Sequence, residues 1–246
     1  MDSHQASIIG GRQRQEDASA LRVRQDGSGA LLVVADGLGG HEGGNVASAL
    51  AVEGFTRAFE APGRLPMPDR LRGALRASQA ALATRIAQDP TLEDMGTTLV
   101  AAVLSPKSLR WISVGDSLLL LLRDGKLRRM NDDHSYRPML DFLVRTGNIT
   151  EEEALRHPGR HSLQCCLDGC RPPKKVDCPK RGTPLLPGDR IVVASDGLET
   201  LTHEEIAALV GRQRSAADCV GALITAVQAK GNPTQDNTTV QVAIVD

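Results

Sequence analysis

The fold is decided by the stretch Leu31-Leu32-Val33-Val34-Ala35-Asp36-Gly37-Leu38-Gly39-Gly40-His41, in which an apolar run passes directly into an acidic residue on a glycine-rich loop. A short apolar run bounded by turn residues is typical of a buried strand, and glycines allow a backbone approach that larger side chains would block. The stretch therefore predicts a core strand that delivers the Asp36 carboxylate to the edge of a sheet. Taken alone, the same residues also fit an ordinary Asp-Gly hairpin turn.

The same pattern recurs elsewhere in the chain. Residues 190–197 form a second apolar strand that ends in Asp-Gly, Asp116 follows another apolar strand, and Asp236 stands just before the alternating strand at 238–245. Carboxylates gathered at one edge without an evident basic partner repel one another, and each raises the pKa of its neighbours. A hard divalent cation among them would relieve this repulsion, since such ions prefer oxygen ligands.

Composition limits the class of protein. The chain has 246 residues, 41% hydrophobic and 24% charged, which is typical of a soluble globular protein. No clear linker divides it, so we expect a single domain over 1–246. With a net charge of −1 and an aromatic content of 2%, the chain lacks the basic surface and the stacking side chains of a nucleic-acid binder.

No secretory signal begins the chain, and no apolar run approaches the roughly 20 residues of a membrane span. We therefore expect a cytoplasmic monomer without a membrane or nucleic-acid partner.

Hydrophobic periodicity and turn residues predict the order of elements. Capping boxes, in which Thr150 pairs with Glu153 and Thr202 with Glu205, mark the starts of two helices. The remaining helices are predicted over 45–60, 69–88 and 215–230, with Gly231 as the stop of the last. Strands are predicted at 8–9, 31–35, 96–104, 110–114, 190–194 and 238–245, together with a hairpin of 118–123 and 126–130.

This order indicates an α+β fold with antiparallel sheets, because the strands occur in groups and the helices in pairs, without strict βαβ alternation. The interval from Asn131 to Lys180 differs from the rest. It contains scattered prolines and cysteines and one predicted short helix, and we interpret it as a mobile insertion or flap.

Four of the five cysteines fall within fourteen residues. The odd number and the absence of an export signal favour reduced thiols. A zinc knuckle is the alternative, but the spacing is not the paired Cys-x-x-Cys of the familiar zinc sites. We therefore expect packed or redox-exposed thiols rather than a metal site at Cys165, Cys166, Cys170, Cys178 and Cys219.

Seven short motifs in order resemble the metal-dependent serine/threonine phosphatases of the protein phosphatase 2C (PPM) type, particularly their bacterial members. No phosphate loop, nucleophile elbow or zinc-protease helix competes with this interpretation. The resemblance spans nearly the whole chain and rests on Arg12-Gln13-Arg14-Gln15-Glu16-Asp17, Asp36-Gly37-Leu38-Gly39-Gly40-His41, Gly96-Thr97-Thr98, Val114-Gly115-Asp116-Ser117, Asp132-Asp133-His134-Ser135, Ser195-Asp196-Gly197 and Asp236-Asn237.

The resemblance implies a ligand set for two Mn²⁺ or Mg²⁺ ions. Asp36 would bridge both ions, and the Gly37 carbonyl would complete one coordination shell. Asp196 and Asp236 would hold the second ion. Asp116, together with Asp196, matches the position of a third and weaker ion in bacterial relatives.

Three further residues receive roles from the same resemblance. Glu16 and Asp17 would act on the ions through bound water, and Arg12 would grip the substrate phosphate. The acid–base chemistry of histidine, rather than the resemblance, makes His41 a candidate for protonating the leaving oxygen; the alternative is that it caps a turn of the glycine loop. Gln15 departs from the family, which usually has Asn at this position.

The implied fold is a four-layer α-β-β-α sandwich, with two antiparallel sheets packed face to face and a flap at about 131–180. The implied reaction is hydrolysis of phosphoserine and phosphothreonine by a water or hydroxide that bridges the ions, on phosphoproteins and in opposition to a cognate serine/threonine kinase. A cysteine-rich run at 163–169 departs from bacterial relatives and leaves flap behaviour and substrate choice open. Two other functions remain open as well: a pseudophosphatase that only binds its partner, and a small-molecule phosphatase on the same scaffold.

Overall fold

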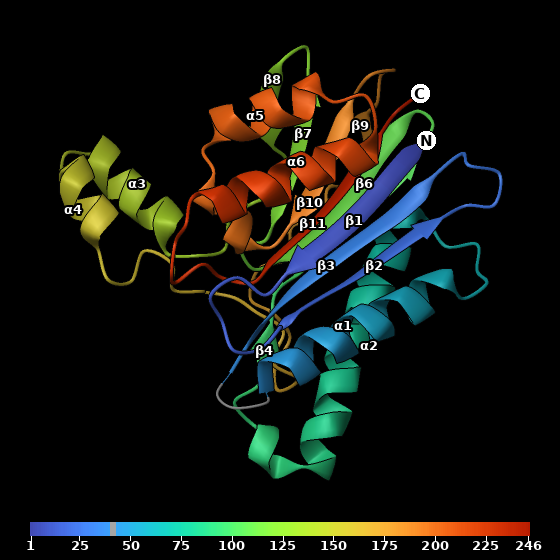
Figure 1. Ribbon diagram of the computed structural model, residues 1–246. Coiled ribbons are helices and arrows are strands. Elements are labelled where there is room, and N and C mark those ends of the chain that lie inside the picture. The colour runs from blue at the N-terminus through green and yellow to red at the C-terminus, as the bar shows by residue number, and fades with distance from the viewer. Residues whose placement is uncertain (40–42) are drawn as a thin grey trace.

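The structure is a computed structural model that describes residues 1–39 and 43–246. Two antiparallel sheets pack face to face, and a pair of helices covers the outer face of each (Figure 1). This arrangement confirms the predicted α+β four-layer sandwich. His41 lies outside the described residues, so the structure does not bear on its predicted role.

All strand pairs in both sheets are antiparallel. The first sheet has the order β1 (Asp2–Ile8), β11 (Thr238–Ile244), β10 (Arg190–Ala194), β7 (Leu118–Arg123) and β8 (Lys126–Arg129). The second sheet has the order β2 (Asp17–Val23), β3 (Ala30–Leu38), β5 (Leu99–Ser105), β6 (Ser108–Val114) and β9 (Thr183–Pro184), and the short β4 (Gly96–Thr97) pairs with the end of β3.

The central strands β3, β5, β7 and β10 are apolar on both faces because each sheet is covered on both sides. Side chains alternate between faces along a strand. On β3, Leu32 and Val34 therefore face the other sheet and pack with Val193 of β10, whereas Leu31 and Val33 face the helices. This explains why the central strands read as continuous apolar runs instead of alternating ones.

Helices α1 (Gly43–Glu60) and α2 (Met67–Gln88) pack on the second sheet, followed by the short 3₁₀ helix η1 (Pro90–Leu92). Helices α5 (His203–Arg212) and α6 (Ala216–Ala229) pack on the first sheet. The capping box that opens α5 is present as predicted. Within residues 1–39 and 43–246, no helix has the length and apolar character needed to cross a bilayer.

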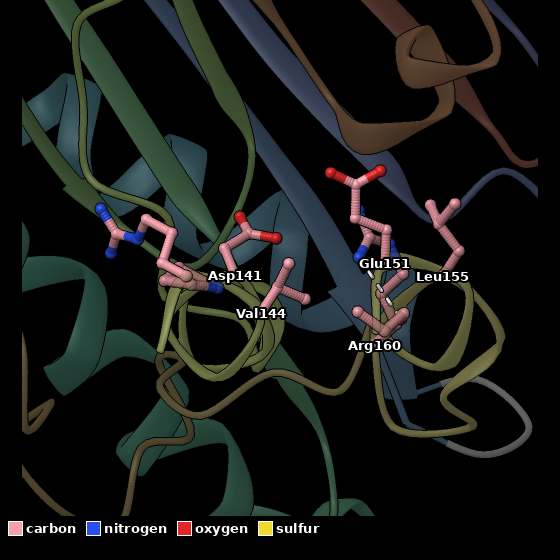
Figure 2. Close-up of a pocket in the computed structure, with 8 residues that line it drawn as sticks. Asp141, Val144, Glu151, Leu155 and Arg160 are labelled. Carbon is pink, nitrogen blue, oxygen red and sulfur yellow. Dashed lines mark hydrogen bonds between the residues drawn. The ribbon is translucent and has the colours of Figure 1, made fainter. Parts of the chain in front are cut away.

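The segment after β8 forms a helical hairpin that projects from one end of the sandwich (Figure 1). It contains α3 (Arg137–Arg145) and α4 (Glu151–Arg156), and the predicted capping box opens α4. A cleft of about 500 Å³ lies between the two helices (Figure 2). The chain then returns to the second sheet, where Leu167 forms a bridge with Thr97 and Asp177 with Ser113.

One predicted element needs correction, and other elements of the structure were not predicted. The strand expected at 96–104 is broken at Thr98, because the Thr98 N–H donates to the Asp36 carbonyl at 2.9 Å. Strand β2 was not predicted, since its edge position leaves most of it only partly buried and its alternation weak. Helix α3 was not predicted either; its Pro138 lies in the first turn, where proline is tolerated.

The first strand also differs from its prediction. It runs over Asp2–Ile8 and does not include the expected residue Ile9, which is 44% exposed. Pairing with β11 along its full length explains why this polar segment is a strand. Tertiary pairing here overrides a weak local signal.

We predict that Leu32→Ala lowers the free energy of unfolding by about 2–5 kcal/mol, because it leaves a cavity between the two sheets. Leu32 is fully buried, whereas Leu65 is 64% exposed. The matched change Leu65→Ala should therefore cost less than about 0.5 kcal/mol. Urea unfolding of both variants is the measurement, and equal losses in the two would contradict the inter-sheet position of Leu32.

Candidate metal centre

The predicted acidic residues meet because their strands end at the same end of the sandwich. Asp17 at the start of β2 is the register partner of Asp36 near the end of β3. In the other sheet, β10 ends and β11 begins side by side, with Ala194 opposite Val240. Asp196 follows the first of these strands and Asp236 precedes the second, so antiparallel pairing places acids from both sheets together.

Asp36 is held by its backbone. Its N–H donates to Thr98 Oγ1 and its carbonyl accepts from Thr97 Oγ1, both at 2.9 Å. The next residue, Gly37, must be glycine, because a Cβ there would lie 2.1 Å from the Gly44 carbonyl oxygen. Burial, followed by the charges of Asp17 and Asp196, raises the pKa of Asp36 well above its ordinary value.

Asp17 is fixed from two sides. Ser195 Oγ donates to Asp17 Oδ2 at 2.7 Å, and the Asp17 N–H donates to Gln15 Oε1 at 3.1 Å. Gln15 thus supports the backbone of the acidic pair. Burial raises the pKa of Asp17 to about 6, although hydrogen bonds to Ser195 and Thr239 oppose this rise.

Asp196 and Asp116 also belong to the cluster. Asp196 begins the 3₁₀ helix η2 (Asp196–Thr200), and burial and the nearby Asp236 raise its pKa. Asp116 is 4% exposed, and burial and the charge of Asp196 raise its pKa to about 7. The raised pKa values show that bringing the carboxylates together is electrostatically unfavourable.

Arg12 forms an ion pair with Asp236. Its Nη2 donates to Asp236 Oδ2 at 2.6 Å, and its side chain is 55% exposed. Burial lowers the pKa of Arg12, but Asp236 more than compensates and the net shift is upward. The acids therefore have a basic partner, contrary to the expectation from the sequence.

Glu16 lies at the same edge. Its N–H donates to Asn237 Oδ1 at 2.7 Å, and a Cβ on Gly44 would lie 3.0 Å from its Oε2. Burial raises the pKa of Glu16, while Arg12 lowers it. The carboxylate therefore sits in a confined space beside the loop that follows β3.

Asn237 is a positioning residue that the sequence analysis did not assign. Its Nδ2 donates to the carbonyls of Ile9 at 2.8 Å and Arg14 at 3.0 Å. Together with its bond from Glu16, it ties the loop after β1 to the start of β11. The only sequence signal was its place directly after Asp236 in a family motif.

A second unassigned group is an ion-pair network of Arg129, Arg137, Asp133 and Glu199. Arg137 donates to both Glu199 oxygens at 2.6 Å, and Arg129 Nη2 donates to the Asp116 carbonyl at 2.6 Å. The network therefore connects the first residue of α3 with η2 and with the turn that carries Asp116. Arg129, Asp133 and Arg137 follow one another at four-residue spacing, but Glu199 lies 62 positions beyond Arg137, so no local pattern could reveal the whole network.

The donor set fits hard divalent cations in chemistry and charge. It offers carboxylate oxygens, and the buried atoms Asp17 Oδ1 and Asp196 Oδ1 have no hydrogen-bond partner within the described part of the chain. In the same part of the chain, no three His, Cys, Asp or Glu side chains are already arranged to hold a metal ion. Asp236 is paired with Arg12, so a metal ion that binds Asp236 would compete with this ion pair.

The five cysteines are all free thiols. Cys165, Cys178 and Cys219 are buried, whereas Cys170 is exposed. Burial raises the pKa of Cys166 to about 11, which disfavours the thiolate form that binds zinc or attacks electrophiles. Nothing in their environment indicates a zinc knuckle.

Comparison with known proteins places this geometry in a family. The model of the protein phosphatase 2C family matches residues 5–232. The serine/threonine protein phosphatase PstP of Mycobacterium tuberculosis is 34% identical over 215 residues, which are 87% of this chain and 40% of PstP. The chain thus spans less than half the length of that relative.

Two further proteins match over almost the full length of the chain. The serine/threonine phosphatase Stp of Listeria welshimeri is 31% identical over 236 residues, covering 93% of this chain and 89% of Stp. A crystal structure of the PstP catalytic domain in complex with two manganese ions has a TM-score of 0.79 and 31% identity, covering 99% of this chain and 98% of that one. The chain belongs to the protein phosphatase 2C family.

Proposed function

We propose that this protein is a metal-dependent phosphoprotein phosphatase that hydrolyses phosphoserine and phosphothreonine. The observation that carries the proposal is the convergence of acids from both sheets beside Arg12, at one end of the sandwich. The family membership and the two manganese ions in the PstP structure support it. We further propose that it acts in the cytoplasm as a monomer and opposes a serine/threonine kinase.

The proposed ligands divide into two groups. Asp36, the Gly37 carbonyl, Asp196 and Asp236 would hold two Mn²⁺ or Mg²⁺ ions, and Asp116 with Asp196 would hold a weaker third. Glu16 and Asp17 would act through water. When bound, such ions supply Lewis-acid stabilisation of the phosphoryl group and an activated water.

Arg12 is the proposed phosphate-binding residue. Its planar guanidinium matches two phosphoryl oxygens and stays charged at any working pH. It is half-exposed at the edge of the acidic cluster, so an entering phosphate can compete with Asp236 for its N–H groups. His41 stays a candidate for protonating the leaving serine or threonine oxygen.

The segment 131–180 is the proposed flap. The network of Arg129, Arg137, Asp133 and Glu199 joins its first helix to η2 beside the acids. The presence of the complete acid set and of Arg12 disfavours a pseudophosphatase. A small-molecule phosphatase shares the same chemistry, and a comparison of phosphopeptides with small phosphoesters distinguishes the two.

We predict that hydrolysis of phosphoserine and phosphothreonine peptides requires added Mn²⁺ or Mg²⁺. Asp36→Asn should reduce kcat by at least about 100-fold and remove tight metal binding, because one residue would contact both ions. Asp116→Asn should slow turnover but leave the tight sites occupied. The measurements are phosphate release and calorimetric Mn²⁺ titration. Full activity in excess chelator, or unchanged metal binding in Asp36→Asn, would exclude the proposed site.

We predict that the apparent Mn²⁺ affinity rises with pH between about 5.5 and 7.5, because ligands must lose their protons to bind metal. The metal-free pKa values are about 6 for Asp17 and about 7 for Asp116. Titration at about pH 6 in two buffers of different ionisation enthalpy should reveal proton release.

The raised pKa values of Asp17 and Asp116 also affect the stability of the metal-free protein. Both lie above the unfolded-state value of about 3.9, so between about pH 4 and pH 7 the folded chain binds more protons than the unfolded chain. In chelator, the free energy of unfolding should therefore be greatest near pH 4 and fall as the pH rises to about 7. Urea unfolding at a series of pH values tests this, and a rise over that range would contradict it.

We predict that Arg12→Lys raises KM about tenfold, because lysine keeps the charge but loses the paired hydrogen bonds to phosphate. The effect should appear with p-nitrophenyl phosphate as well as with phosphopeptides, since both present the same group. Arg22→Lys, a change at the 56% exposed arginine of β2, is the matched control and should leave KM unaltered. Equal kinetics in the two variants would remove Arg12 from the site.

A further inference from the structure

A groove of about 460 Å³ lies between α2 and residues 169–176, the return segment, which follows the helical hairpin within 131–180. Leu75 and Ala83 of α2 and Val176 of the return segment form apolar parts of its lining, and Arg72, Arg76 and Arg171 are also part of the lining. None of these residues belongs to the metal cluster described above. The groove therefore needs an explanation of its own.

The charged side chains in the lining of this groove are all positive. Two acids adjoin the lining in sequence, and both accept hydrogen bonds. Asp168 Oδ1 accepts from Gln79 Nε2 at 3.1 Å and from the Cys170 N–H at 2.9 Å, and Asp177 Oδ2 accepts from Trp111 Nε1 at 2.8 Å. Lys174 and Lys175 are exposed immediately beyond the lining. In a chain with a net charge of −1, this concentration of positive charge favours an acidic ligand.

The cleft in the flap hairpin does not have this property. Figure 2 shows Asp141 and Glu151 in that cleft, and Arg145 and Arg160 also line it. Both signs of charge are therefore present, and the cleft has no preference for an acidic or a basic ligand. Charge complementarity distinguishes the groove on α2 from the cleft.

The shape of the groove suits an extended peptide. Its lining runs along α2 from Arg72 to Ala83, a length of about 16 Å at 1.5 Å per residue. An extended chain covers this length with about five residues. Alternating acidic and apolar side chains could then meet the arginines and the apolar lining.

The return segment is held firmly against α2, so the groove is preformed. Gln79 Nε2 donates to the Arg171 carbonyl at 2.7 Å. At Gly169, which has a φ of +72°, a Cβ would lie 2.8 Å from the Ala83 nitrogen. A preformed site loses little conformational entropy on binding.

The groove is also connected to the strand that carries Asp36. Leu167 exchanges two backbone hydrogen bonds with Thr97, at 2.8 and 2.9 Å, and Thr97 Oγ1 donates to the Asp36 carbonyl. Leu167 precedes Gly169 of the groove by two residues. A chain seated in the groove thus rests on a segment that is bonded to the metal-bearing strand.

We propose that this groove docks an acidic segment of the phosphoprotein substrate, separate from the phosphorylated residue. The proposal rests on the proposed phosphatase function. It assigns substrate choice partly to Arg76 and Arg171, which do not take part in the chemistry.

The first test measures binding without catalysis. A fluorescein-labelled peptide of sequence DLEVDLE, mixed with the full chain in chelator, should give saturable anisotropy, and its lysine analogue KLKVKLK should not bind. Arg76→Glu/Arg171→Glu should weaken binding about tenfold. The matched control is Arg57→Glu/Arg156→Glu, which makes the same change in net charge at side chains that are 76% and 80% exposed, and it should bind like the native chain.

Several outcomes would overturn docking. Equal losses in the two double variants would mean that only net charge matters, and binding of the lysine analogue would remove the acidic preference. Full displacement of the peptide by inorganic phosphate would indicate a simple anion site. A change of sedimentation coefficient in the groove variant alone would assign the groove to a second copy of this chain.

The second test separates docking from the proposed function. A phosphothreonine peptide that carries an acidic segment should show about a tenfold higher KM with the groove variant, while kcat/KM for p-nitrophenyl phosphate stays unchanged. Loss of activity on both substrates in every variant, the native chain included, would refute the phosphatase function and leave the binding result standing. Unchanged KM for the acidic phosphopeptide would refute docking and leave the phosphatase function standing.

Discussion

The electrostatic repulsion among the carboxylates at one end of the sandwich is the constraint on which the site depends. Asp17 and Asp36 are direct partners on neighbouring strands, and like charges in that position destabilise a sheet. Burial and neighbouring acids raise the pKa of Asp36 well above its ordinary value. The fold nevertheless holds these groups together, because its strands are anchored by apolar layers on both faces. Such a cluster is stable only where the core is rigid enough to oppose the repulsion, and useful where cations can replace protons.

Polar side chains that do not belong to the acid set hold it in place. Ser195 fixes Asp17, Thr97 and Thr98 fix the Asp36 backbone, and Asn237 holds the loop that carries Arg12. These are hydrogen bonds between distant segments, and each satisfies a backbone or carboxylate group that would otherwise be buried without a partner. The organisation resembles that of metal sites in general, in which outer residues orient the ligands.

The insertion between β8 and β9 has two parts with different attachments. Helices α3 and α4 project from the sandwich (Figure 1) and are joined to η2 through the bidentate pair of Arg137 and Glu199. The later part is bonded to β4 and β6 through Leu167 and Asp177. The projecting hairpin can therefore differ in mobility from the return segment, which is part of the sandwich surface and forms one wall of the arginine-lined groove.

The amino-acid sequence by itself determined the elements whose signals are local: the buried strand before Asp36, the capping boxes, the hairpin of β7 and β8, and the acids placed at strand ends. These follow from side-chain periodicity and turn chemistry within a few residues. Tertiary structure decided what depends on distant partners. Strand β2 is formed by pairing along β3, and Arg12 meets Asp236 across 224 positions of the chain. Arg137 likewise reaches Glu199 across 62 positions, because only the folded chain brings these groups within hydrogen-bonding distance.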